Sequence, residues 1–106
     1  MSVEKLYRAY RADIENNKPE LVSLAEPLAL RKDSAALYML NRLEHAQGGN
    51  EIRGVLIVLE EMKYRRTFDP CKDKAFYVRL VRAWKRSDPN DEYGNAQGIQ
   101  SLCGAR

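Results

Sequence analysis

The sequence predicts an all-α protein, a compact antiparallel bundle of five to six short helices. Three observations predict this fold class. Apolar residues recur at the three-to-four-residue spacing of one helix face. No segment convincingly alternates apolar and polar residues as a strand does. The predicted connections are short, as they are between antiparallel helices. The chain has 106 residues, of which 44% are hydrophobic. That is enough for one domain with a modest core.

The first helix is predicted over residues 3–16. Its apolar stripe consists of Val3, Leu6, Tyr7, Tyr10 and Ile14. A second helix is expected to begin at Pro19. Backbone N–H groups in the first turn form no hydrogen bond within the helix, so the N–H that proline lacks is not needed there. Inside a helix, proline costs roughly 3 kcal/mol. Pro27 therefore predicts a break or kink near residues 26–27 that leaves residues 28–30 as a separate turn.

Gly48-Gly49 is predicted to end a third helix that covers residues 35–47. Asp33 or Ser34 can cap the start of this helix. Its inward-facing residues are predicted to be Leu37, Leu40 and Leu43.

A fourth helix is predicted over residues 51–66, with Asn50 as its cap. It has the most regular apolar stripe in the chain, formed by Ile52, Val55, Leu56, Leu59 and Met62. Ile57 and Val58 widen that stripe. This helix is therefore predicted to be the central and most buried one.

Asp69 followed by Pro70 predicts the start of a last helix over residues 70–86. Its core face is predicted to consist of Tyr77, Leu80, Val81 and Trp84. Residues 88–106 contain three glycines and no apolar periodicity. We therefore predict a helical domain over residues 1–87 and a disordered tail over residues 88–106.

Cys71 and Cys103 are predicted to be free thiols, because a bridge to a loose tail would stabilise little structure. A disulfide between them is the alternative. Free thiols are typical of reducing compartments, and the N-terminus is too charged for a secretory signal. No apolar run approaches the roughly 18 residues needed to span a bilayer. The sequence thus predicts a cytoplasmic protein without membrane association, with the nucleus as the alternative compartment.

The residues predict neither an enzyme nor a cofactor or metal site. The one histidine, His45, is interpreted as a partly exposed residue in the last turn of the third helix, where the dipole favours a cation. The two cysteines lack neighbouring zinc ligands, and the glycines form no phosphate-binding motif. Cys71 is a nucleophile candidate at a helix N-terminus, but no general base adjoins it. No small-molecule substrate is predicted.

Residues 36–68 resemble the middle of death-effector-type domains of the death-fold superfamily. The matching residues in the first helix of the motif are Leu37, Tyr38, Leu40, Leu43 and Glu44. Those in the second are Asn50, Ile52, Leu56, Leu59, Arg65 and Arg66. Of the family's Arg-x-Asp-Leu motif, only the arginine is present. The resemblance implies a six-helix bundle, homotypic assembly in apoptotic or innate-immune signalling, and no catalysis.

Basic residues are concentrated in residues 62–86, which contain nine Lys or Arg and only two acidic residues, Asp69 and Asp73. This segment has a net charge of +7, whereas the whole chain has +3. Helix C-termini favour cations, which explains some of these residues but not Lys72, which is predicted to lie in a first turn. So concentrated a charge predicts an acidic partner.

We therefore expect a non-enzymatic interaction or adaptor module that binds an acidic protein surface through a basic face on its last helix. The seven residues predicted to form this face are Lys63, Arg65, Arg66, Lys72, Arg79, Arg82 and Arg86. Nucleic-acid binding by the same face is the alternative, because phosphates are also attracted to clustered cations.

Overall fold

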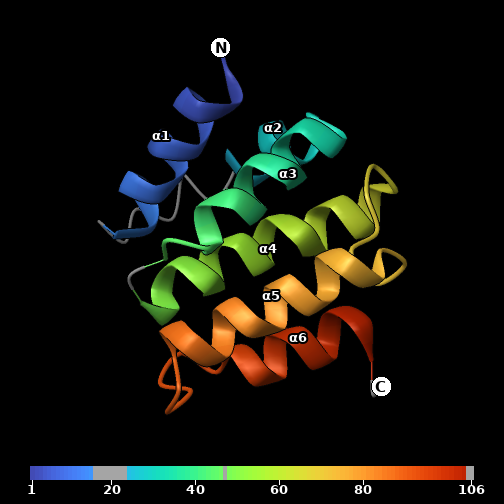
Figure 1. Cartoon of the computed structure of the whole chain (residues 1–106). Helices are drawn as coiled ribbons and strands as arrows, with labels where there is room; N and C mark the ends of the chain where they lie inside the picture. The colour runs from blue at the N-terminus through green and yellow to red at the C-terminus, as the bar shows by residue number, and fades with distance from the viewer. Residues whose placement is uncertain (16–23, 47, 105–106) are drawn as a thin grey trace.

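The computed structural model of the chain describes residues 1–15, 24–46 and 48–104. This part of the chain contains helices and no strand. The helices are α1 (Val3–Glu15), α2 (Ala25–Ala29), α3 (Lys32–Leu43), α4 (Gly49–Arg65), α5 (Lys74–Ser87) and α6 (Asn95–Cys103) (Figure 1). The predicted all-α fold class is confirmed.

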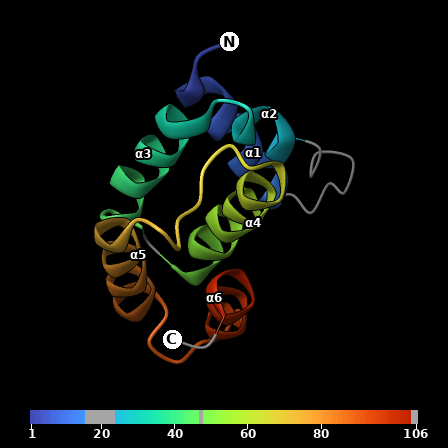
Figure 2. The same ribbon diagram turned by 90° about the vertical axis from the view of Figure 1, so that its right-hand side faces the viewer.

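From α2 onward the helices form two layers, and the chain alternates between them. In one layer α3 contacts α5, while in the other α2 contacts α4 and α4 contacts α6, and α1 packs on α2, α3 and α4. Figure 2 shows α3 and α5 on one side of the molecule and α4 and α6 on the other. From α3 onward, each helix runs opposite to the one before it (Figure 1). The bundle is therefore a stack of helix pairs, an arrangement in which each pair packs on its neighbour.

The helix α4 lies at the centre of the stack and contacts all five of the other helices. Its buried residues are Gly49, Glu51, Ile52, Gly54, Val55, Leu56, Val58, Leu59 and Met62. The Tyr10 hydroxyl of α1 donates a hydrogen bond to the Gly54 carbonyl of α4 over 2.7 Å. The prediction that this helix is central and most buried is confirmed.

The first two helices confirm one prediction and correct another. Helix α1 buries Leu6, Tyr7 and Tyr10, as its apolar stripe predicts. The predicted break at Pro27 is wrong, because Pro27 is the third residue of α2. First-turn N–H groups have no partner within a helix, so proline costs α2 no hydrogen bond. The predicted start at Pro19 lies outside the described residues.

The third helix differs from the prediction in its start and in its inward face. It begins at Lys32, ahead of the predicted caps, without a side-chain cap. Ser34 Oγ instead donates a hydrogen bond to the Arg31 carbonyl over 2.8 Å. Met39 is buried, whereas Leu37, predicted to face inward, is 57% exposed. The glycines that follow do not form a left-handed C-cap, because the second of them is already the first residue of α4.

The fifth helix begins at Lys74, four residues later than predicted. Asp73 caps it by accepting a hydrogen bond from the backbone N–H three residues on, over 3.0 Å. Asp69 forms a turn instead, since its carboxylate accepts a hydrogen bond from the Cys71 N–H over 2.9 Å. Two capping residues four positions apart made the sequence ambiguous. In consequence Lys72 lies in the α4–α5 loop and not on α5.

Residues 95–103 form α6, so the predicted disordered tail from residue 88 is wrong. Three residues of α6 are buried: Asn95, Ile99 and Leu102. The Asn95 amide donates hydrogen bonds to the Gly49 carbonyl over 3.0 Å and to the Asp88 carboxylate over 3.1 Å. Asp88 is itself buried and accepts the Glu92 N–H over 2.9 Å. These bonds fasten the α5–α6 loop to the first turn of α4.

Cys71 and Cys103 form a disulfide, which corrects the prediction of free thiols. The bond joins the α4–α5 loop to the last residue of α6 across a sequence separation of 32. In the chain-entropy description, a crosslink of this length stabilises the folded state by about 3–4 kcal/mol. The prediction failed because it assumed that Cys103 lies in a loose tail.

Gly49→Ala is expected to destabilise the protein. An added methyl group would lie 2.6 Å from Asp88 Cγ and 2.7 Å from the ring of Tyr93. The Asp88 carboxylate cannot move aside without losing its hydrogen bonds to Asn95 and Glu92. We expect the free energy of unfolding in urea to fall by about 1–3 kcal/mol, the usual cost of overpacking.

Gly48→Ala is the matched control, because an added methyl group there meets no atom within 4 Å. Its free energy of unfolding should stay within about 0.5 kcal/mol of the unmodified protein. Equal stability of the two variants would contradict the close packing of Asp88 on the start of α4.

Candidate functional site

Two of the seven predicted basic residues, Arg65 and Arg79, are neutralised within the protein. Arg65 pairs with Glu61 over 2.8 Å and with Glu26 of α2 over 3.0 Å. The hydrogen bond to Glu61 raises the pKa of the Arg65 guanidinium above its ordinary value. Arg79 pairs with Glu44, which follows α3. Because carboxylates balance both charges, these residues contribute little free positive charge to the surface.

Two more of the seven donate hydrogen bonds to backbone carbonyls. Arg86 donates to the Leu43 carbonyl over 2.6 Å and so links α5 to the end of α3. Lys63 Nζ donates to the Leu102 carbonyl of α6 and lies 3.8 Å from Cys71 Sγ. Both side chains keep their charge, but each uses hydrogen-bond donors to hold two helices together.

The side chains of the remaining three form no hydrogen bond or ion pair within the described part of the chain: Arg66, Lys72 and Arg82. Arg82 is exposed on α5. The other two line a hollow of about 430 Å³ at the α4–α5 loop, together with Lys63. Phe68 gives this hollow an aromatic wall, and Asp69 is the only carboxylate among its described lining residues. We call this site the basic hollow and define it by Lys63, Arg66 and Lys72.

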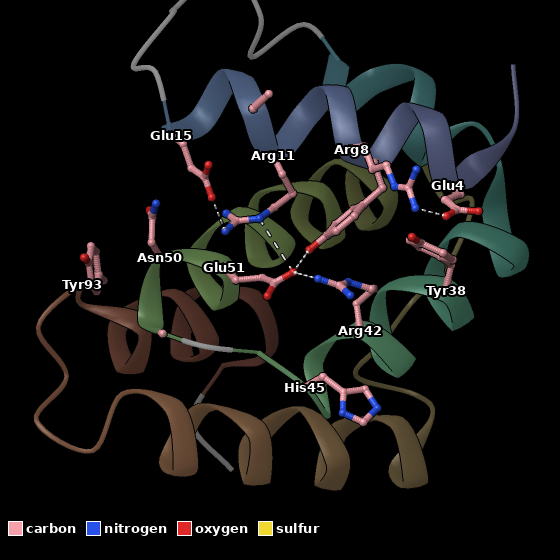
Figure 3. A pocket seen from close by; sticks show the side chains of 13 residues that line it. Glu4, Arg8, Arg11, Glu15, Tyr38, Arg42, His45, Asn50, Glu51 and Tyr93 are labelled. Carbon is pink, nitrogen blue, oxygen red and sulfur yellow. Dashed lines mark hydrogen bonds and ion pairs between the residues drawn. The ribbon is translucent and has the colours of Figure 1, made fainter.

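A larger cleft of about 770 Å³ lies between α1, α3 and the first turn of α4 (Figure 3). One face of α1 contributes Glu4, Arg8, Arg11 and Glu15. Across from it, α3 and the turn after it contribute Tyr38, Arg42 and His45 at helical spacing. Tyr93 of the α5–α6 loop lies at the edge of the cleft (Figure 3).

Glu51 is the buried centre of this cleft and is only 5% exposed. Its Oε2 accepts a hydrogen bond from the Tyr7 hydroxyl over 2.6 Å. The same oxygen lies 3.7 Å from Arg11 Nε and 3.6 Å from Arg42 Nη2, so three side chains converge on it (Figure 3). The positive end of the α4 dipole adds to their effect. We call this site the Glu51 cleft.

The Glu51 cleft was not among the sites that the sequence predicted. Glu51 and Tyr7 are 44 positions apart, so their pairing leaves no local pattern. A partial signal is present on α1, where Glu4, Arg8, Arg11 and Glu15 follow the helical spacing beside the apolar stripe. Such a face is usually solvated, and only the packing of α3 beside it makes a cleft.

Other kinds of site find little support in residues 1–15, 24–46 and 48–104. No group of three or more histidine, cysteine or acidic residues there is placed to hold a metal ion. Among the described helices, none is both long and apolar enough to cross a membrane. His45 is exposed beside the Glu51 cleft.

Comparison of the chain with family models, curated proteins and solved structures finds no match in any of the three. The resemblance to death-effector-type domains therefore stays a prediction. Function has to be inferred from the basic hollow and the Glu51 cleft.

Alkaline pH is expected to destabilise the protein through two buried tyrosines. Burial raises the pKa of Tyr7 well above its ordinary value, and the hydrogen bond to Glu51 raises it further. Burial also raises the pKa of Tyr10. Above about pH 10, the unfolded chain releases these two protons while the folded protein keeps them. The free energy of unfolding should therefore fall as pH rises, by up to about 1.4 kcal/mol per pH unit for each tyrosine.

Urea denaturation between pH 8 and 11 measures this slope. The control is Tyr10→Phe, which removes one titrating group and should make the decline above pH 10 shallower. A stability that stays constant from pH 8 to 11 would show that neither phenol is held in its protonated form by the fold.

Proposed function

We propose that the protein is a non-enzymatic interaction module that binds an acidic segment of a protein partner through the basic hollow. The observation that carries the proposal is the gathering of Lys63, Arg66 and Lys72 around one hollow with an aromatic wall. The side chains of Arg66 and Lys72 have no hydrogen-bond or ion-pair partner among the described residues. Unpaired surface cations attract and orient an acidic partner.

The proposed surface is smaller than the basic face expected from the sequence. Arg65 and Arg79 are excluded from it by their ion pairs. Lys63 remains part of it, because an ammonium group has three donors and the Leu102 carbonyl uses one of them. The recognition element is therefore a local pocket for one or two carboxylates, with Phe68 available to an adjacent apolar side chain.

An acidic protein segment fits this hollow better than nucleic acid does. Nucleic-acid surfaces commonly neutralise many phosphates along a backbone, and each contact steepens the salt dependence of affinity. The basic hollow has three cations, and Asp69 lies among them. Nucleic acid is the alternative that the experiment below distinguishes.

Under the resemblance to death-effector-type domains, the partner would be a second domain of the death-fold superfamily. An acidic patch on such a domain would meet the basic hollow, which is consistent with homotypic assembly. The adaptor role in signalling rests on this resemblance alone.

The disulfide supports a working compartment different from the predicted cytoplasm or nucleus. The prediction assumed free thiols, whereas Cys71 and Cys103 are bonded. Disulfides persist in oxidising compartments and are rare in the cytosol. We therefore place the proposed interaction in a non-reducing environment.

The test uses the double variant Arg66→Gly and Lys72→Gln. Arg66 has a left-handed backbone (φ 61°) as the C-cap of α4, a conformation that glycine adopts without strain. The variant therefore removes two charges without disturbing the end of the helix. The probe is a fluorescent octapeptide with six glutamates around one leucine and one phenylalanine, and anisotropy is measured at 0.05 and 0.15 M salt. We expect the variant to lose at least about fivefold in affinity, since two charge-assisted contacts disappear.

The matched control is Lys5→Gln with Lys85→Gln, which removes the same charge from exposed positions away from the hollow. Its affinity should stay within about twofold, the size of a general charge effect at moderate salt. An equal loss of affinity in both double variants would show that binding depends on the net charge of the protein and not on the basic hollow, and would contradict the proposal. Tighter binding of a single-stranded oligonucleotide than of the peptide, with a steep salt dependence, would favour the nucleic-acid alternative.

A further inference from the structure

We propose that the Glu51 cleft binds a small organic anion, a molecule with a carboxylate or phosphate group on an apolar body, and that Arg42 is the residue that holds this group. The site is separate from the basic hollow and does not depend on the interaction proposed there. The proposal rests on the size of the cleft, on the distribution of its hydrogen-bond donors and on its aromatic walls.

The volume of the cleft suits a small molecule. At about 770 Å³, it falls within the range of roughly 300–1,000 Å³ typical of sites for cofactors and small ligands. Residues from three helices and two loops line it (Figure 3). A ligand there would contact parts of the chain that are far apart in sequence.

The arginines of α1 are already paired on their own helix. Arg8 pairs with Glu4, and Arg11 pairs with Glu15 over 3.1 Å. These pairs follow the i, i+4 spacing at which opposite charges meet on a helix surface. The α1 side of the cleft thus offers little free charge of either sign.

The α3 side of the cleft has donors that are not used. A guanidinium carries five N–H donors, yet the Arg42 side chain forms no hydrogen bond within the described part of the chain. Its one interaction there is the 3.6 Å ion pair with Glu51, and 48% of the side chain is exposed. His45, one helical turn further on, also lines the cleft. The Arg42 guanidinium is therefore held by Glu51 on its buried side, while the N–H donors on its exposed side are free to bind a ligand.

The buried network behind Arg42 also has a donor in excess. Glu51 Oε2 is shared by Tyr7, Arg11 and Arg42, and Arg11 Nη1 is buried without a hydrogen-bond partner. A buried donor left unpaired costs free energy. Three donor side chains thus share one carboxylate oxygen, and an incoming oxyanion would give the exposed edge of Arg42 an acceptor of its own. Arginine recognises carboxylate and phosphate through two parallel hydrogen bonds.

Aromatic side chains supply walls for the apolar part of the ligand. Tyr38 lies one turn before Arg42 on α3, and its ring contacts Tyr7 edge to face, with centroids 5.5 Å apart. Tyr93 is 43% exposed at the opposite edge, and Arg53 donates a hydrogen bond to its carbonyl over 3.2 Å. An aromatic or aliphatic body between these rings would bury apolar surface, while its charged group reaches Arg42.

The test is a titration of the disulfide-bonded protein, monitored by amide chemical shifts in NMR, with three probes of the same shape. Benzoate and phenyl phosphate carry the two candidate charged groups, and benzyl alcohol carries neither. We expect benzoate or phenyl phosphate to bind saturably, with the largest shifts at Arg42, His45 and Glu51. The tighter of the two identifies the charged group. Benzyl alcohol should bind at least about tenfold more weakly, because it offers no charge-assisted hydrogen bond.

Arg42→Gln is the decisive variant, because its half-exposed side chain can be replaced without opening the core. It should weaken binding of the preferred anion at least about tenfold, with the amide spectrum otherwise retained. The matched control is Arg82→Gln, which removes the same charge from an exposed position of α5 that does not line this cleft. It should change the affinity less than about twofold. The proposal is overturned if neither anion binds saturably at about 10 mM or below, if benzyl alcohol binds equally well, or if the two variants behave alike.

Discussion

The packing of α4 against every other helix is the constraint on which the rest of the described structure depends. A helix buried on several sides must be apolar around much of its circumference, and α4 meets this requirement with a stripe that continues from Ile52 to Met62. Gly49 adds a place without a side chain, where Asp88 and Tyr93 come close. The two-layer stack follows, because α4 shares a layer with α2 and α6 and faces α1, α3 and α5.

The central helix also determines where the two candidate sites lie. Glu51 belongs to its first turn, while Lys63 and Arg66 belong to its last turn and C-cap. A helix of 17 residues is roughly 25 Å long, so the Glu51 cleft and the basic hollow lie at opposite ends of one rigid element. The buried carboxylates near the first turn and the basic residues at the end both follow the direction of the helix dipole. The charged residues that are favourable at the two ends of the α4 dipole thus also form the two candidate sites.

The parts of the fold that the sequence could predict are those written in local patterns. The stripes of α1 and α4 predicted two helices and the central position of α4, because regular apolar spacing directly reflects burial. The start of α5 was wrong, because Asp69 and Asp73 are both good caps and only the tertiary fold decides between them. Helix α6 was missed because its buried residues Asn95, Ile99 and Leu102 are few, and one of them is polar.

The sites were harder to predict, because they depend on residues that are distant in sequence. Composition located the basic segment, but it could not show that Glu26 and Glu44 neutralise two of its arginines. The Glu51 network spans 44 positions and joins three helices. The disulfide can form only when α6 packs against the rest of the bundle. The composition of residues 88–106 is typical of a disordered tail and does not predict this packing. Charge and composition therefore indicated what kinds of residue were present, and packing decided which of them stayed free.

Native-state hydrogen exchange tests the central role of α4 most directly. Amides that open only when the whole protein unfolds exchange with the global free energy of unfolding, whereas peripheral elements open at lower cost. The structure predicts that amides in the middle of α4, from Ile52 to Leu59, show the highest protection, equal to the global value from denaturation. Amides of α1 and α6 should exchange faster. Protection of α4 below that of α1 or α6 would contradict the view that the fold is built around this helix.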